Sequence, residues 1–283
     1  MMSDEVSKAE AEGRSREAAN AGSEAKNETF SLAAGSAPAV PLPAATVLLL
    51  RDDPFEVLMI RRHHKQFFSS ALVFPGGLVH ASDHSDDWLP LVADDEGLGR
   101  DQFALRIAAF RETYEESGVL LARREDGTHL SEAAPGDFVD PPDFIDIVRN
   151  SGGRLHFADL VRFGHWITPD WSPKRFDTHF FLARMPSDQK AVCDGSEAVA
   201  LEWSPPAEII ARAEAGESSI LFPTLMNLYL LAREQDVAGS IAAWRQREVF
   251  TVRPSVEKRE GGTAFVIPAE AGYPKIEYFL KGA

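Results

Sequence analysis

The alternation of apolar and polar positions is clearest in residues 101–116, where it follows the period of an α-helix. One face of this predicted helix carries an apolar stripe made of Phe103, Ile107, Phe110 and Tyr114. At about 100° per residue, the opposite side carries three carboxylates, those of Glu112, Glu115 and Glu116. We expect Asp101 to cap the N-terminus of the helix and Gly118 to end it.

Shorter runs predict strands and further helices along the rest of the chain. The expected strands are residues 45–51, 55–62, 119–123, 162–168, 176–185 and 198–203. The first two flank a turn and form a hairpin, and the strands at 162–168 and 176–185 are expected to pair. The expected helices are residues 143–150, 207–215, 223–234 and 237–248. Residues beyond 248 hold three short strand-like runs, at 249–252, 264–267 and 276–280.

The N-terminal segment lacks the pattern of a folded region. Residues 1 to about 40 are rich in Ala, Glu, Ser, Gly and Lys, and Phe30 is their only aromatic residue. Such a segment buries too little apolar area to offset its ordering entropy, so residues 1–42 are predicted to be a disordered tail. The whole chain is 44% apolar, which supports a core, and we expect residues 43–283 to form one domain.

Charge and cysteine content narrow the class of protein. The formal net charge of −15 argues against a general nucleic-acid or anionic-membrane surface. Cys193 is the only cysteine, which excludes an internal disulfide and fits a reducing compartment. No apolar run reaches 18 residues, and the N-terminus lacks a signal pattern, so a cytoplasmic protein without a membrane span is expected.

The three glutamates carry the strongest chemical signal. At i, i+3 and i+4 their side chains are neighbours on a helix, and their mutual repulsion costs stability unless a cation lies among them. Clustered hard oxygen ligands suit Mg²⁺ or Mn²⁺. The alternative is an exposed acidic helix face, and that reading would prevail if the glutamates stood alone.

The surrounding residues resemble the Nudix box, G-x5-E-x7-R-E-U-x-E-E-x-G-U, in which U is apolar. The second half is matched by Arg111, Glu112, Glu115, Glu116, Gly118 and Val119, with Thr113 at a position that is usually aliphatic. Gly77 matches the leading glycine after the usual Phe74-Pro75-Gly76, and Asp83 stands at the first Glu position. The spacer from residue 84 to residue 110 is far longer than seven, so residues 84–103 are interpreted as an insertion within the box.

An insertion at this point resembles the coenzyme-A-cleaving, peroxisomal branch of the Nudix hydrolases. Further similarity lies at residues 73–77, 110–121, 166–169 and 175–181, and the resemblance extends over residues 43–235. The branch has a basic signature before Phe-Pro-Gly-Gly, of which Arg61 matches the first arginine, whereas Gln66 replaces the second. The basic stretch at residues 61–65 is interpreted either as a phosphate-binding segment or as a solvated strand end.

The resemblance implies a Nudix α/β/α sandwich with a mixed sheet, and residues 223–283 are then a C-terminal extension with extra helices. It implies that Glu112, Glu115 and Glu116 hold Mg²⁺ or Mn²⁺ and that Glu112 or Glu197 is the general base. Glu197 is the candidate for a fourth metal ligand or for the base, and Glu202 is its rival. Arg111 is expected to orient carboxylates, pairing with Glu115 and Asp83. Gly76 and Gly77 allow a close backbone approach. For substrate phosphates the candidates are Arg61 and Arg175, although an ion pair with a carboxylate explains Arg175 equally well, and His179 is interpreted as a strand histidine.

The implied function is metal-dependent hydrolysis of a nucleoside diphosphate linked to another group. Coenzyme A or an acyl-coenzyme A is the expected substrate, giving 3′,5′-adenosine diphosphate and a phosphopantetheine. The alternatives are a dinucleotide, a nucleotide sugar or a capped RNA as substrate, or a Nudix-fold binding module without turnover. The insertion is expected to be a lid, a contact in a homodimer, or a loop packed on its own domain.

Overall fold

The computed structural model describes residues 37–62, 71–95, 97–131, 143–193 and 198–281. Most of the predicted tail at residues 1–42 therefore lies outside the described residues. The same holds for residues 63–65 of the basic stretch, for Gln66 and for Glu197.

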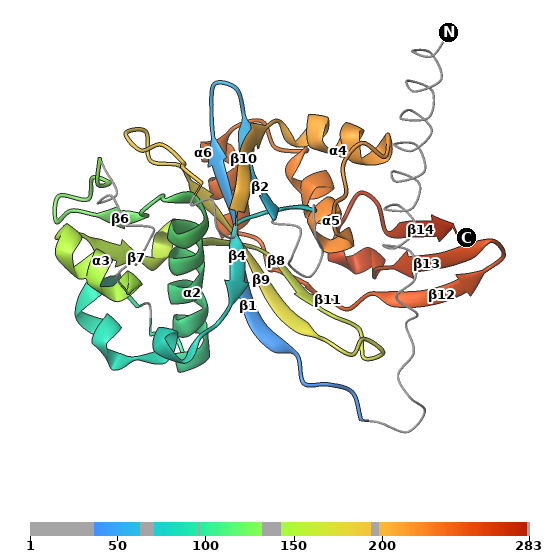
Figure 1. The fold of residues 1–283 in the computed structure, drawn as a ribbon, viewed down its shortest axis with the longest axis horizontal. Coiled ribbons are helices and arrows are strands. Elements are labelled where there is room, and N and C mark those ends of the chain that lie inside the picture. The colour runs from blue at the N-terminus through green and yellow to red at the C-terminus, as the bar shows by residue number, and fades with distance from the viewer. Residues whose placement is uncertain (1–36, 63–70, 96, 132–142, 194–197, 282–283) are drawn as a thin grey trace, which may run out of the picture.

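A mixed sheet forms the centre of the molecule, with strand order β10-β2-β1-β9-β8-β11 (Figure 1). β1 pairs in parallel with β9 and β8 with β11, whereas the other neighbours are antiparallel. Two short strands add to this sheet, β3 beside β2 and β4 beside β1. The bounds are β1 Leu42–Arg51, β2 Glu56–Arg62, β3 Leu72–Val73, β4 Gly76–Leu78, β8 Val161–Ile167, β9 Phe176–Arg184, β10 Ala198–Ser204 and β11 Thr251–Val252. The predicted β1–β2 hairpin and β8–β9 pair are confirmed.

Helices cover both faces of this sheet, because its buried strands carry apolar side chains on both sides. In β1, Val47 and Leu49 enter the core beneath α2 (Arg100–Ser117) and α3 (Phe144–Ser151). The alternate residues Leu48 and Leu50 enter the opposite core. That second core is closed by α4 (Pro206–Glu214), α5 (Phe222–Leu231) and α6 (Val237–Arg245). The expected α/β/α sandwich with extra C-terminal helices is confirmed.

Helix α2 is buried along most of its length, including all four residues of the predicted apolar stripe. Gly118 ends it in the left-handed conformation, with φ of 69°, as expected. The predicted cap is wrong: Gly99 occupies the N-cap position, and Asp101 lies in the first turn, where its charge still favours the positive end of the helix. Thr113 is fully buried and its hydroxyl donates to the Ala109 carbonyl at 2.7 Å, so a polar residue is accommodated at this usually aliphatic position.

The insertion packs on its own domain, which is the third of the expected alternatives. The short 3₁₀ helix η1 (Ala81–His84) leads into it, and the insertion itself begins with a second one, η2 (Asp86–Leu91), followed by β5 (Val92–Asp94). β5 joins β7 (Arg154–His156) and β6 (Ala122–Arg123) in a small second sheet beside α2 (Figure 1). Trp88 is buried there, 5.6 Å from the ring of Phe144, and its indole N–H donates to the Ser82 carbonyl at 3.0 Å.

The C-terminal segment forms a third sheet of β12 (Ser255–Arg259), β13 (Gly262–Val266) and β14 (Glu277–Lys281). A buried hydrogen-bond chain ties this segment to the main sheet and to α5. The indole of Trp166 donates to the Tyr273 hydroxyl at 2.8 Å, and that hydroxyl donates to Asn227 Oδ1 at 3.0 Å. Within the described residues, no helix is both long and apolar enough to cross a membrane.

Removal of the Tyr273 hydroxyl tests this attachment. Tyr273→Phe leaves the Trp166 donor and the Asn227 acceptor without their shared partner inside the core, which costs about 1–3 kcal/mol of unfolding free energy. The matched control is Tyr229→Phe, because the Tyr229 hydroxyl meets Glu214 at the surface, and its expected cost is within about 0.5 kcal/mol. Urea unfolding followed by circular dichroism measures both. Equal costs for the two variants would contradict a structural role for the buried chain.

Candidate active site

The C-terminal half of α2 is built around the guanidinium of Arg111, which is buried. Its Nε and Nη2 donate to the two carboxylate oxygens of Asp83, both at 3.0 Å. Nη1 donates to Glu112 at 2.6 Å and to Glu115 at 2.8 Å. Nη2 also donates to the Leu78 carbonyl at 2.9 Å. Both expected partners of Arg111, Glu115 and Asp83, are therefore in contact with it, and Glu112 is a third.

The electrostatics of this cluster follow from burial among carboxylates. Burial opposes the charge of Arg111, but the hydrogen bond to Asp83 and the charges of its carboxylate partners outweigh it and raise the pKa of the guanidinium. Burial also raises the pKa of Glu115, with the nearby charge of Glu112 acting in the same direction and Arg111 opposing it. The guanidinium thus stays charged, and the acidic residues retain a mutual repulsion that it does not fully cancel.

The Gly76-Gly77 segment brings the backbone against these carboxylates. β4 pairs with the first half of β1, so that Gly77 lies opposite Ala45 and below α2. The amide of Gly76 donates to Glu116 Oε2 at 2.7 Å. A methyl group on Gly77 would lie 2.5 Å from the Glu112 carboxylate, which is closer than a real contact allows. The glycine is therefore required by the position of Glu112.

Asp83 completes the cluster and lies in η1, directly before the insertion in the chain. Its carboxylate is fully buried and accepts a hydrogen bond from the His80 amide at 2.8 Å in addition to those from Arg111. Glu112 and Glu116 are buried, and 47% of the Glu115 side chain is exposed. Arg111 thus offsets only part of the negative charge of these four carboxylates, and the hard oxygen donors of Glu112, Glu115 and Glu116 suit a divalent cation.

The remaining predicted residues lie elsewhere. Arg61 is half-buried in β2, opposite Leu72 of β3. Arg175 is buried and bonded to the carbonyls of Thr168 and Ala39, with an ion pair to Asp170 at 2.5 Å. These contacts favour the ion-pair interpretation of Arg175, with Asp170 as the partner carboxylate.

Glu202, the rival of Glu197, already has partners near it in the fold. Its carboxylate accepts hydrogen bonds from Arg212 of α4 and from the Ser204 hydroxyl. Burial favours the neutral form of Glu202, but these two hydrogen bonds outweigh it and lower the carboxyl pKa. The side chain is therefore held as a carboxylate against α4. Glu197 itself lies outside the described residues.

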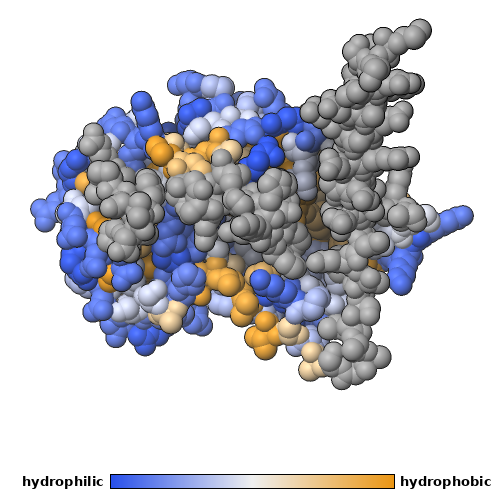
Figure 2. All heavy atoms as spheres, viewed as in Figure 1, coloured by the Kyte–Doolittle hydropathy of each residue, from blue (hydrophilic) through white to orange (hydrophobic). Residues whose placement is uncertain are grey.

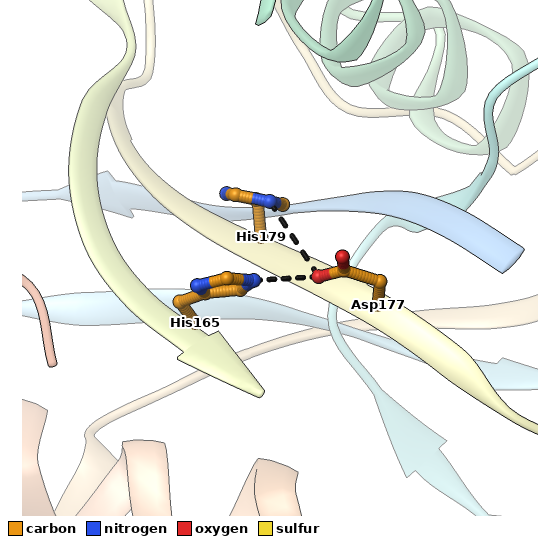
Figure 3. Close-up of side chains that lie close together, drawn as sticks. All are labelled: His165, Asp177 and His179. Atoms are coloured by element: carbon orange, nitrogen blue, oxygen red, sulfur yellow. Dashed lines mark hydrogen bonds and ion pairs between the residues drawn. The ribbon is translucent and has the colours of Figure 1, made fainter. Parts of the chain in front are cut away.

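A second group of polar side chains lies on β8 and β9, and the sequence analysis did not predict it. His165, Asp177 and His179 come together there (Figure 3). Burial, with the neighbouring charges of His165, Arg162 and Arg106, lowers the pKa of His179 to about 4, while Asp177 opposes that shift. His179 is thus neutral at pH 7. His165 lacks any sequence motif, and only the strand register reveals its position opposite His179.

Substitution of Gly77 tests the close approach of β4 to α2. Gly77→Ala should displace the Glu112 carboxylate and weaken Mn²⁺ binding by about 10- to 100-fold, the usual effect of disturbing the groups that position metal ligands. Gly99→Ala is the matched control, because a Cβ on Gly99 meets nothing within 4 Å. The signal of free Mn²⁺ in electron paramagnetic resonance measures both affinities. Unchanged binding by Gly77→Ala would show that Glu112 is not a ligand or has room to move.

The chain is similar to several known proteins. A family model described as the NUDT19 Nudix domain matches residues 25–102 and 93–231. The acyl-coenzyme A diphosphatase NUDT19 of Xenopus laevis is 29% identical over 280 residues, which cover 78% of this chain and 72% of the frog protein. The human protein of that name is 29% identical over 207 residues and 55% of each chain.

Among solved structures, a NUDIX hydrolase from Alicyclobacillus acidocaldarius superimposes with a TM-score of 0.62 at 28% identity. The match covers 72% of this chain and 96% of that one. The residues matched by the family model make up more than half of the chain, and they include the whole split box from Gly77 to Val119. The protein therefore belongs to the NUDT19 Nudix domain family and is a Nudix-type diphosphatase.

Proposed function

We propose that this diphosphatase hydrolyses coenzyme A or its acyl esters, giving 3′,5′-adenosine diphosphate and phosphopantetheine or its acyl ester. The observation that carries the proposal is the buried carboxylate cluster around Arg111, held against the Gly76-Gly77 backbone. Support for the substrate comes from the frog and human relatives, both called acyl-coenzyme A diphosphatases.

The carboxylates of Glu112, Glu115 and Glu116 would hold Mg²⁺ or Mn²⁺. When bound, such an ion compensates the negative charge of the diphosphate and increases the acidity of coordinated water. Arg111 positions Glu112 and Glu115 rather than the substrate, because its donors are taken up by protein oxygens. The Gly76 amide holds Glu116 in the same way.

The reaction itself breaks one bridging P–O bond of the diphosphate. The oxygen of a water molecule forms a bond to one phosphorus, the bridging oxygen leaves with the other phosphate, and a glutamate accepts the proton released from water. Glu112 and Glu197 are the candidates for this base. Glu202 is a weaker candidate for the base than either of them, because its carboxylate already accepts hydrogen bonds from Arg212 and Ser204.

Arg61 is the candidate contact for a substrate phosphate away from the diphosphate. It lies at the end of β2, one strand from β3, which leads directly into Phe74 and the Gly76-Gly77 segment. The positive charge of Arg61 acts on Glu202 and helps to lower the pKa of that carboxyl group.

A second candidate function is the same hydrolysis of another nucleoside diphosphate derivative, such as a dinucleotide, a nucleotide sugar or a capped RNA. It is favoured by Gln66, which stands where the coenzyme-A signature has its second arginine. A binding module without turnover is disfavoured, because Glu112, Glu115 and Glu116 are all present in the cluster around Arg111.

Identification of products by mass spectrometry tests the proposal. The purified protein with Mg²⁺ or Mn²⁺ is incubated with coenzyme A, acetyl-coenzyme A, NADH, ADP-ribose, diadenosine polyphosphates and capped RNA. We expect 3′,5′-adenosine diphosphate from the coenzyme A compounds. The Glu115→Gln/Glu116→Gln variant should lose at least about 100-fold in rate, since removing groups that act in the transition state typically costs this much.

The matched control is Glu208→Gln, a change of the same chemistry on the exposed surface of α4, which should leave the rate unchanged. Cleavage of a different compound in the panel would contradict the coenzyme A assignment but retain the mechanism. Equal activity in the Glu115→Gln/Glu116→Gln variant would contradict the mechanism.

A further inference from the structure

Sheet register places two histidines side by side, away from the carboxylates of α2. His165 of β8 lies directly opposite His179 of β9, and Thr251 of β11 lies opposite His165. Asp177 lies two residues before His179 and therefore on the same face of β9. The adjacent Phe180 enters the core beneath α4–α6, so these side chains occupy the other face, which α2 covers.

The three side chains turn their polar atoms toward one point. Figure 3 shows both imidazoles presenting a ring edge to the Asp177 carboxylate. The Asp177 Oδ1 atom lies 2.5 Å from His165 Nε2 and 3.6 Å from His179 Nε2. Two donors bound to one ion at typical N and O bond lengths are about 3–3.5 Å apart, and these separations bracket that value.

The surroundings hold the His165 ring in a defined orientation. His165 Nδ1 is 2.7 Å from the Thr251 hydroxyl, which leaves Nε2 for the shared point. An outer hydrogen bond of this kind is how metal-binding histidines are oriented in proteins. The two rings stack with centroids 4.0 Å apart and planes inclined by 22°, so they lie side by side next to the Asp177 carboxylate.

We propose that His165, Asp177 and His179 form a second metal site, which takes a transition-metal ion such as Zn²⁺. Two imidazoles and one carboxylate suit Zn²⁺ and similar ions, whereas Mg²⁺ prefers oxygen donors alone. Three protein ligands leave coordination positions open for water or for a phosphate oxygen of a ligand.

This site is distinct from the carboxylate cluster, although both lie on the same face of the sheet. The register forms one row across the strands, from Gly77 through Ala45 and His179 to His165. With about 4.8 Å between neighbouring strands, the backbone of His179 lies about 10 Å and that of His165 about 14 Å from the backbone of Gly77. Gly77 in turn lies against the Glu112 carboxylate. One ion cannot bridge both sites, but a substrate lying along the row could contact both.

Cobalt binding tests the proposal without any measurement of activity. The full chain carrying Glu115→Gln/Glu116→Gln, which weakens the α2 cluster, is freed of metal with a chelator and titrated with Co²⁺. Visible absorption follows coordination by nitrogen ligands. We expect one Co²⁺ per chain, displaced by one equivalent of Zn²⁺. Addition of His179→Gln or Asp177→Asn should weaken binding by at least about tenfold, as loss of metal-site groups does.

The matched control is His156→Gln in the same background, since His156 lies on β7 in the other sheet and should leave the absorption unchanged. Thermal unfolding provides a second readout: Zn²⁺ should raise the melting temperature of the parent but not of the Asp177→Asn variant, which keeps a hydrogen-bonding amide. No Co²⁺ absorption in the parent, or equal binding in the parent and the His179→Gln and Asp177→Asn variants, would overturn the proposal and leave a hydrogen-bonded His-Asp-His cluster.

Discussion

The buried charge of Arg111 is the constraint on which the rest of the site depends. A guanidinium removed from water destabilises the fold unless its donors are satisfied, and here they bind Asp83, the Leu78 carbonyl and two glutamates of α2. Asp83 is 28 residues away in the chain, so this one cation fixes the start of the insertion against the middle of the helix. The two halves of the box are far apart in sequence, but they are in contact in the fold because Arg111 binds Asp83 from one half and Glu112 and Glu115 from the other.

The central sheet then determines what these groups face. β4 replaces β2 beside the first half of β1, which places Gly77 below Glu112 and leaves no room for a side chain. Because β9 runs parallel to β1, His179 falls on the same row two strands away. Gly77, which touches Glu112, and the histidine cluster thus lie on one row of the strand register, on the sheet face that α2 covers.

The sequence predicts those features that have a short-range signal. The apolar stripe of α2, its end at Gly118 and the β1–β2 hairpin follow from local periodicity and glycine placement. The Gly99 cap was missed because it makes no side-chain hydrogen bond. The strand β12 was missed because its last three residues are all charged, so it lacks the alternation of apolar and polar positions. The pairing of His165 with Asp177 depends on the register of β8 and β9, which one sequence does not contain.

The most direct test of this account is the Mn²⁺ affinity of Asp83→Asn, followed by electron paramagnetic resonance beside Asp86→Asn. Both carboxylate oxygens of Asp83 accept hydrogen bonds from Arg111, whereas Asp86 makes an exposed ion pair with Arg100. If Arg111 organises the glutamates, Asp83→Asn binds Mn²⁺ about 10- to 100-fold more weakly while Asp86→Asn is unchanged. Equal affinity in the folded Asp83→Asn variant would contradict the role assigned to the buried cation.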